Sequence, residues 1–234
     1  MSMTGVRTST RWALALAIAL GAWSVVWAQA APDARAQEMA SCLPGENVTW
    51  LDGQDRPAAG GAVRLVYRHT GAPPWFDEAL VLGAVQRAAA AWATCGVPAE
   101  VIGETAALIN PTQVTVVQWN DAQTRGNFAL ADLGQRTVSL SAAMFRVLAE
   151  RNPRHPAAQT LQMAISHEMG HFFGLMAHSR RCIDVMSYYT HPSGESCSTR
   201  HGGSHKIGGG VEYRAVLPTA CDIARCRAVN GTGR

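Results

Sequence analysis

Neither sign of charge is in marked excess in this sequence, and charged residues are few. Lys and Arg number 20 against 17 Asp and Glu, which gives a formal net charge of +3, and charged residues make up 16% of the 234 residues. Proteins that bind nucleic acid or anionic membrane surfaces carry clustered positive charge. The composition therefore predicts no nucleic-acid partner and no stable membrane association of the mature chain. Hydrophobic residues, at 47%, suffice for one well-formed core.

The cysteines lack the spacing of a zinc ribbon or of a thioredoxin-type redox site. No Cys-x-x-Cys pair occurs among the six of them: Cys42, Cys95, Cys182, Cys197, Cys221 and Cys226. An even number in an exported chain indicates disulfides. We expect Cys182 to pair with Cys197. Cys221 and Cys226 are too far apart to pair with each other if both lie on one regular helix, and their partners stay open, with Cys42 and Cys95 as candidates.

The N-terminus has the composition of a secretory signal peptide. Arg7 and Arg11 precede an apolar run from Trp12 to Ala28, and small residues at positions 28 and 30 offer a cleavage site. We expect residues 1–30 to be removed on export, which predicts a secreted or periplasmic protein. An uncleaved membrane anchor is the alternative, because the apolar run is long for a signal.

No internal repeat is present, and the rest of the chain predicts one main domain. Residues 31–60, rich in Ala, Pro, Gly and Asp, indicate an N-terminal arm or a short pro-segment, and residues 61–234 the domain itself. Hydrophobic periodicity predicts strands at residues 62–69, 113–119 and 136–141, and helices at residues 77–94, 157–174 and 220–228. This order predicts an α+β fold with an α/β-type upper lobe and a smaller, irregular C-terminal lobe.

The predicted helix at residues 157–174 carries a group of metal-binding character. His167 and His171 lie one helical turn apart, so both imidazoles leave the same face and can bind one ion. Glu168 lies beside His167 and can reach a water molecule on that ion. In so apolar a helix, this carboxylate would be costly to bury without a cation nearby. The pattern predicts a Zn²⁺ site with Glu168 as general base.

A third protein ligand is expected, because catalytic zinc sites usually combine three protein ligands with water. Gly174 can end the helix in a left-handed conformation and turn the chain back toward the metal. His178 is the favoured third ligand. Asp184 is a second candidate, and a site without a third protein ligand is the remaining alternative.

The stretch His-Glu-x-x-His-x-x-Gly, followed by Val-Met-Ser-Tyr at residues 185–188, resembles the metzincin clan of zinc endopeptidases. The third histidine of that signature would fall at Ala177, whereas here it comes one residue later, at His178. The resemblance therefore implies a one-residue bulge in the loop after the helix. It also implies a two-lobed fold with a twisted mixed sheet, a Met-turn that places Met186 beneath the metal, and a Tyr188 that stabilises the oxyanion or ligates zinc.

The function implied by this resemblance is a secreted zinc endopeptidase acting on protein or peptide substrates. Zinc would be held by His167, His171 and His178, and the substrate would lie extended along an edge strand near residues 127–141. The rival hypothesis is a secreted, disulfide-stabilised binding module that keeps the fold without hydrolysis. Glu168 argues against it, since a binding module needs no general base. His201 and His205 are expected to lie in an exposed glycine-rich loop rather than to form a second metal site.

Overall fold

The sequence predicted three strands of the sheet, and the structure adds two short ones. In the computed structural model, which describes residues 33–107, 113–200 and 213–233, five strands form one mixed sheet in the order β2-β1-β3-β5-β4. The strands are β1 (Val63–Arg68), β2 (Ala99–Val101), β3 (Val114–Trp119), β4 (Ala129–Asp132) and β5 (Thr137–Leu140). β4 runs antiparallel to β5 at one edge, and the other pairings are parallel.

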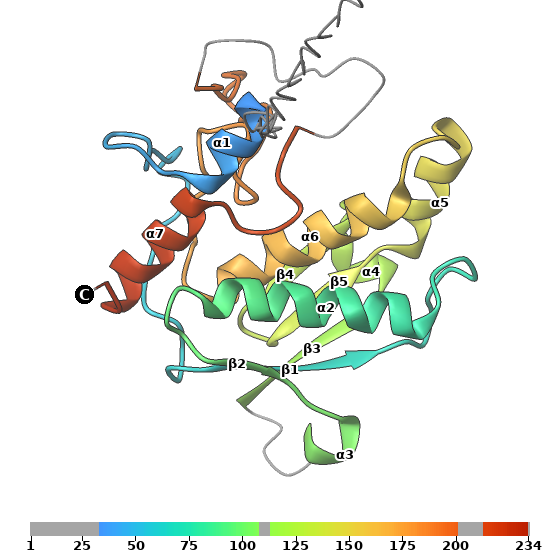
Figure 1. The fold of residues 1–234 in the computed structure, drawn as a ribbon. Helices are drawn as coiled ribbons and strands as arrows, with labels where there is room; N and C mark the ends of the chain where they lie inside the picture. Colours follow the sequence, from blue (N-terminus) through green and yellow to red (C-terminus); the bar gives the residue numbers. More distant parts are fainter. Residues whose placement is uncertain (1–32, 108–112, 201–212, 234) are drawn as a thin grey trace, which may run out of the picture. The chain divides into compact units, whose positions relative to one another are not determined.

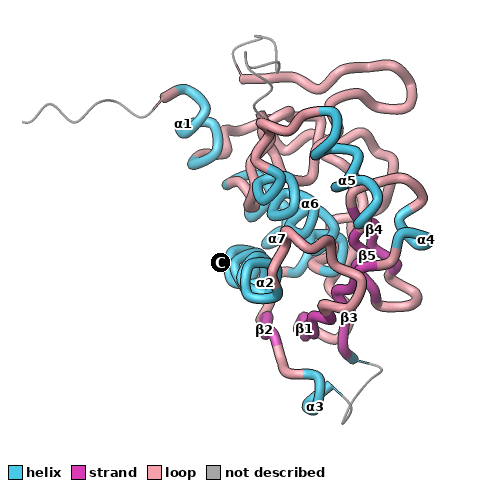
Figure 2. Tube along the Cα trace, turned by 90° about the vertical axis from the view of Figure 1, so that its right-hand side faces the viewer, coloured by secondary structure: helices cyan, strands magenta, loops and turns pink. Residues whose placement is uncertain are grey.

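Two long helices cover one face of this sheet. α2 (Glu78–Ala93) and α6 (Ala157–Phe172) lie side by side above the strands in Figure 1, and the side view of Figure 2 places both on the same side. The indole N–H of Trp92 on α2 donates to the backbone oxygen of Ser166 on α6 at 2.8 Å. Because Trp92 is fully buried, this bond satisfies a polar group that water cannot reach.

Local sequence explains where both helices begin. Asp77 caps α2, since its side chain accepts a hydrogen bond from the backbone N–H of Leu80 at 2.7 Å. Pro156 precedes the first residue of α6, where the fixed φ of proline suits the start of a helix. Both helices, and strands β1, β3 and β5, were predicted within two residues of their observed ends, and the α+β class is confirmed at this coarse level.

Several short elements were not predicted. They are β2, β4 and the helices α1 (Ala34–Ala40), α3 (Glu104–Ala107), α4 (Asp121–Thr124) and α5 (Ala142–Arg151). The last helix, α7 (Ala220–Asn230), was predicted, and its start is fixed by a capping box between Thr219 and Asp222. β4 matters most, because it forms the edge of the sheet that faces α6.

Three disulfides link the described cysteines. Cys182 bonds to Cys197 as expected, while Cys42 bonds to Cys221 and Cys95 bonds to Cys226. The last two tie the N-terminal half of the chain to α7, and such bonds form and persist in oxidising compartments. Among the described residues, no helix combines the length and apolar character needed to cross a membrane. The predicted signal peptide and the pair His201 and His205 lie outside the described residues.

Candidate metal centre

α6 carries the first part of the candidate site on its last two turns. His167 and Glu168 are buried there, and His171 follows one turn after His167, so that their rings lie 5.4 Å apart. The helix ends one residue later, at Phe172. The spacing of four residues has therefore placed two imidazoles on one face, as the sequence predicted.

Gly174 turns the chain back immediately after the helix. Its φ of +100° lies in the region that glycine adopts without strain, and a Cβ at this position would overlap the backbone oxygen of Arg56. The turn is closed by a hydrogen bond from the N–H of Leu175 to the backbone oxygen of Gly170 at 3.1 Å. The chain can thus approach the histidines of α6 from a second direction.

His178 arrives from that direction and completes a cluster of three histidines. Its ring lies 5.1 Å from that of His167 and 5.2 Å from that of His171, and one nitrogen from each ring falls within 4.8 Å of the others. Ala177, which occupies the position expected for the third ligand, is buried. The structure therefore brings together the three histidines that the sequence nominated.

The hydrogen bonds of the three rings identify the nitrogens that face the centre of the cluster. Nδ1 of His167 lies 2.7 Å from the oxygen of Val185, and Nδ1 of His171 lies 2.7 Å from the oxygen of Leu175. Nδ1 of His178 lies 2.7 Å from Oδ2 of Asp52. Because each of these partners can only accept, each Nδ1 carries the proton and each Nε2 keeps a lone pair. Metal-binding histidines are usually held in this way.

Burial keeps these rings neutral. It lowers the pKa of His171 to about 4, lowers the pKa of His178, and lowers that of His167 well below its ordinary range. The proximity of the other two histidines adds to the effect at His167. Neutral imidazole is the form that binds a metal ion, so the ligand set is ready near neutral pH.

Glu168 lies between this cluster and the edge strand. Its Oε2 accepts a hydrogen bond from the backbone N–H of Ala131 on β4 at 2.8 Å and lies 4.0 Å from Nε2 of His171. Burial raises the pKa of the carboxyl to about 8, against the opposing effect of the Ala131 hydrogen bond. The contact with β4 fixes the carboxyl near Nε2 of His171.

Met186 packs against α6, and Tyr188 packs against His178. Met186 is fully buried under α6, where a side chain at Gly170 would overlap its sulfur. Tyr188 stacks on the ring of His178 with centroids 3.9 Å apart, and burial raises its pKa to about 12. The phenol is therefore a proton donor at any physiological pH.

Asp184, the alternative third ligand, points elsewhere. Its Oδ2 accepts from the hydroxyl of Ser179 at 2.6 Å, and its Oδ1 accepts from Thr219 at 2.7 Å and from Arg181 at 3.2 Å. These buried hydrogen bonds hold the carboxylate of Asp184 at the N-terminus of α7. The suggestion that Asp184 could replace His178 is therefore wrong, because its oxygens are held away from the cluster.

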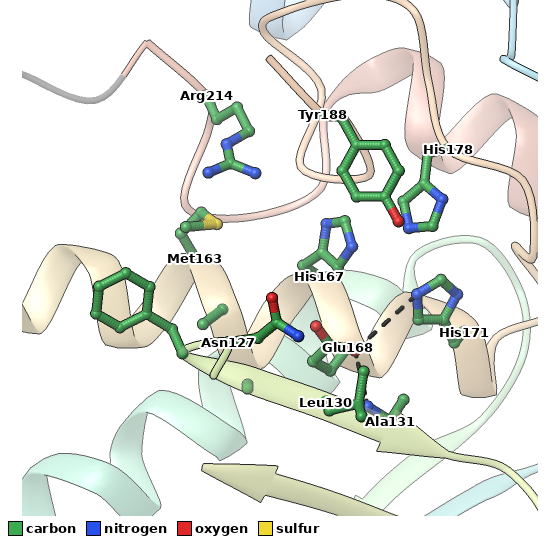
Figure 3. A pocket seen from close by; sticks show the side chains of 13 residues that line it. Asn127, Leu130, Ala131, Met163, His167, Glu168, His171, His178, Tyr188 and Arg214 are labelled. Atoms are coloured by element: carbon green, nitrogen blue, oxygen red, sulfur yellow. Dashed lines mark hydrogen bonds and ion pairs between the residues drawn. The ribbon is translucent and has the colours of Figure 1, made fainter. Parts of the chain in front are cut away.

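The cluster opens into a pocket with a volume of about 340 Å³ (Figure 3). One wall is the edge of the sheet from Asn127 to Ala131, and the other is α6 with Met163, closed by Arg214 and Tyr188. The sequence did not predict Asp52 and Arg214, because segments near the two ends of the described chain bring them to the site. It also missed Ala131, which acts through its backbone and leaves no mark in the sequence.

Comparisons with known proteins provide little beyond this geometry. No family model matches the sequence, and no curated protein matches it. Among solved structures, similarity was found to one described as "GM1 bound form of the ECX AB5 holotoxin", with a TM-score of 0.40 and 14% identity over 82% of this chain and 92% of that chain.

The description of that structure is of a GM1-bound toxin, so it gives no support to the secreted endopeptidase predicted from the sequence. We therefore correct the prediction of a secreted endopeptidase. The pocket supports the coarser statement that three histidines and a buried carboxyl lie together, and it assigns no peptide bond as the substrate. At this level of similarity the match carries no argument about what the present chain binds or does.

Proposed function

We propose that this chain is a zinc-dependent hydrolase whose metal is held by His167, His171 and His178. The observation that carries the proposal is the convergence of three neutral imidazoles, each with its Nδ1 proton bound to an acceptor and its Nε2 lone pair left for a metal. Three nitrogen ligands with room for water are typical of catalytic zinc sites. The donor set therefore fits Zn²⁺.

The residues around the cluster suit hydrolysis. Zinc bound there would lower the pKa of a water molecule and polarise a substrate carbonyl. Glu168 is held near Nε2 of His171 by its hydrogen bond from Ala131. A cation bound by the histidines would lower the raised pKa of this carboxyl, and the ionised carboxylate could then take a proton from that water and pass it to the leaving group. Tyr188 has its hydroxyl in the pocket and can donate to a developing oxyanion.

We also propose the finer fold assignment, a metzincin-like domain. It is supported by the helix that follows the first strand, by the antiparallel edge strand β4 beside α6, and by the methionine packed beneath the histidine-bearing helix. Secretion through the N-terminal signal is a further proposal, supported by the three disulfides.

The experiment measures zinc content and turnover together. Purified protein with its disulfides intact should bind one equivalent of zinc and hydrolyse at least one member of a panel made of an activated ester, an anilide and an unfolded polypeptide. Glu168→Gln should keep the zinc and lose at least about 100-fold in turnover. Glu150→Gln, which changes an exposed carboxylate on α5, is the matched control and should behave as wild type.

The outcomes separate the two hypotheses. Turnover that survives in Glu168→Gln contradicts the assigned base. Zinc bound at one equivalent with no turnover of any panel member favours the rival, a disulfide-stabilised binding module. Absence of zinc from the wild-type protein after metal loading contradicts the metal centre itself.

A further inference from the structure

We propose that residues 48–56, here called the arm segment, are a permanent part of the metal centre, and that Asp52 is a positioning residue that sets the tautomer and direction of His178. The inference rests on the proposed zinc site. The segment that it concerns lies in the region predicted from sequence as an N-terminal arm or a pro-segment.

The arm segment pairs with residues 174–180, here called the ligand loop, along its whole length. The N–H of Arg56 donates to the oxygen of Gly174 at 3.0 Å, and the N–H of Trp50 donates to the oxygen of His178 at 2.9 Å. Beyond the histidine, the N–H of Arg180 donates to the oxygen of Val48 at 3.0 Å. The loop that delivers His178 is therefore held by backbone hydrogen bonds before, at and after that residue.

Asp55 accounts for the extra residue in the ligand loop. Its Oδ1 accepts from the backbone N–H groups of Met176 at 2.8 Å and Ala177 at 3.0 Å. A bulged loop turns such N–H groups away from regular partners, and leaving them unsatisfied would be costly. Arg225 on α7 binds the other oxygen of Asp55 at 2.7 Å and also donates to the backbone oxygen of Ala177. Asp55 and Arg225 therefore both hold the bulge in place through hydrogen bonds to its backbone.

Asp52 acts on the histidine itself. Its Oδ1 accepts from the backbone N–H of His178 at 2.8 Å, and its Oδ2 accepts from Nδ1 of the ring at 2.7 Å. One carboxylate therefore fixes both the backbone and the ring of the same residue. The other two histidines use backbone oxygens for this purpose, whereas His178 lies on a loop that needs a side chain from another segment.

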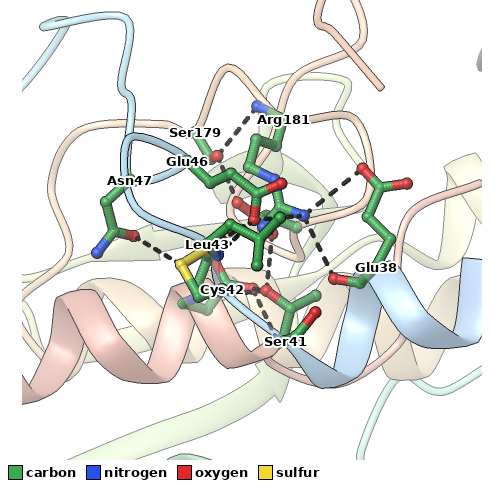
Figure 4. Close-up of a disulfide and its surroundings, with 12 residues drawn as sticks. Glu38, Ser41, Cys42, Leu43, Glu46, Asn47, Ser179 and Arg181 are labelled. Carbon is green, nitrogen blue, oxygen red and sulfur yellow. Dashed lines mark hydrogen bonds and ion pairs between the residues drawn. A yellow bond between two sulfur atoms is a disulfide. The ribbon is translucent and has the colours of Figure 1, made fainter. Parts of the chain in front are cut away.

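The arm segment is anchored on its N-terminal side as well. Cys42 is bonded to Cys221 on α7, and Glu46 accepts two hydrogen bonds from Arg200 at 2.6 and 2.7 Å. The buried Arg181 lies 3.5 Å from an oxygen of Glu38 and 3.7 Å from an oxygen of Glu46. Figure 4 shows both carboxylates beside it. Because a disulfide and a buried ion pair tie these residues to the domain, we infer that they stay attached to it in the mature protein.

The variant Asp52→Asn tests the role of the carboxylate with little change in volume. The amide oxygen can still accept from one N–H, but the NH₂ group then faces Nδ1 and favours the tautomer with the proton on Nε2, which leaves no lone pair on the nitrogen that faces the other two histidines. We expect the zinc dissociation constant, measured by competition with a chelating dye, to rise about 10- to 100-fold. The visible spectrum of the Co²⁺-substituted protein should change with it.

The matched control is Asp77→Asn, since asparagine caps α2 as well as aspartate does. This variant should keep the zinc affinity and the Co²⁺ spectrum of wild type. Asp52→Asn with both readouts unchanged, in a protein where His178→Ala loses zinc, overturns the role of Asp52 and leaves the zinc site standing.

A second measurement on the unaltered protein covers the case in which Asp52→Asn does not fold. The ¹⁵N chemical shifts of the His178 ring in zinc-free wild type report which nitrogen carries the proton. A protonated Nδ1 and a bare Nε2 are expected, and the opposite tautomer overturns the inference. This readout needs no zinc, so failure of the proposed function, seen as a wild type that binds no metal, is recognised separately.

Discussion

Gly170 determines how closely α6 can approach Met186, which lies beneath the proposed metal centre. A Cβ at this position would overlap the sulfur of Met186 and come within 2.8 Å of Cζ2 of Trp92. All three residues are buried in the core, where neighbours have little room to shift. A glycine inside a helix usually weakens it, so its presence here reflects packing rather than helix stability.

Gly170→Ala should therefore destabilise the protein although alanine favours helix. We expect a loss of about 1 to 3 kcal/mol in the free energy of unfolding, because overpacking outweighs the gain in helix propensity. Urea unfolding monitored by fluorescence measures it. Gly103→Ala is the control, since a Cβ there meets no atom within 4 Å and should change stability little. A Gly170→Ala protein as stable as wild type would show that Met186 can move aside.

Residue spacing reveals only those parts of the site that lie close together in the chain. His167, Glu168 and His171 were predicted because four residues make about one helical turn, which fixes their faces locally. His178 was predicted from its place after Gly174, although the signature put the ligand at Ala177. Asp52 could not be predicted, since it meets His178 across 126 positions of sequence and nothing in its neighbours marks it.

At the scale of elements, long periodic segments could be predicted and short ones could not. α2 and α6 each run for 16 residues, which is long enough for their apolar faces to show in the sequence. β4 has four residues and β2 three, too few for alternation to be distinguished from a loop. The sequence therefore predicted an edge strand only somewhere near residues 127–141, and it did not predict that β4 would bind Glu168.

Glu46, which precedes the arm segment, allows a test of how the stability of the protein depends on pH. Hydrogen bonds from Arg200 lower the pKa of this carboxyl below its usual 4.5, so its contribution to stability is fully present above pH 4.5 and is lost as pH falls through the lowered value. Glu46→Gln should therefore have a lower urea midpoint than wild type at pH 6, and the difference should shrink below pH 4.5.

The control for this prediction is Glu100→Gln, which removes the partner of Arg64 in another pair at 2.6 Å. The Glu100 side chain is 56% exposed, and exposed ion pairs contribute little to stability. Its urea midpoint should follow wild type at every pH. A constant gap between Glu46→Gln and wild type from pH 6 to pH 3 would show that the arm is not held by this carboxylate.

On the scale of the whole molecule, the proposed metal centre joins segments from both ends of the described chain. The arm segment contacts the ligand loop from one side and Arg225 of α7 contacts it from the other, while two disulfides connect α7 to residues 42 and 95. A metal ion bound by α6 and the ligand loop would therefore stabilise the molecule as a unit.

Removal of zinc should lower the melting temperature of the entire protein. A ligand at 1,000 times its dissociation constant stabilises the folded state by about 4 kcal/mol, which corresponds to roughly 10 °C for a chain of this size. Calorimetry before and after dialysis against a chelator measures the shift, and added zinc should restore it. His178→Ala serves as the control and should melt at nearly the same temperature with and without zinc.

The contact between Arg225 and Asp55 also bears on how the protein is made. Asp55 leaves the ribosome early and Arg225 170 residues later, yet both hold the same loop. The contacts that hold the bulge around His178 are incomplete until α7 has been synthesised and the disulfide between Cys42 and Cys221 has formed. Nascent chains would therefore stay free of metal during synthesis, and the centre would assemble as one of the last steps of maturation.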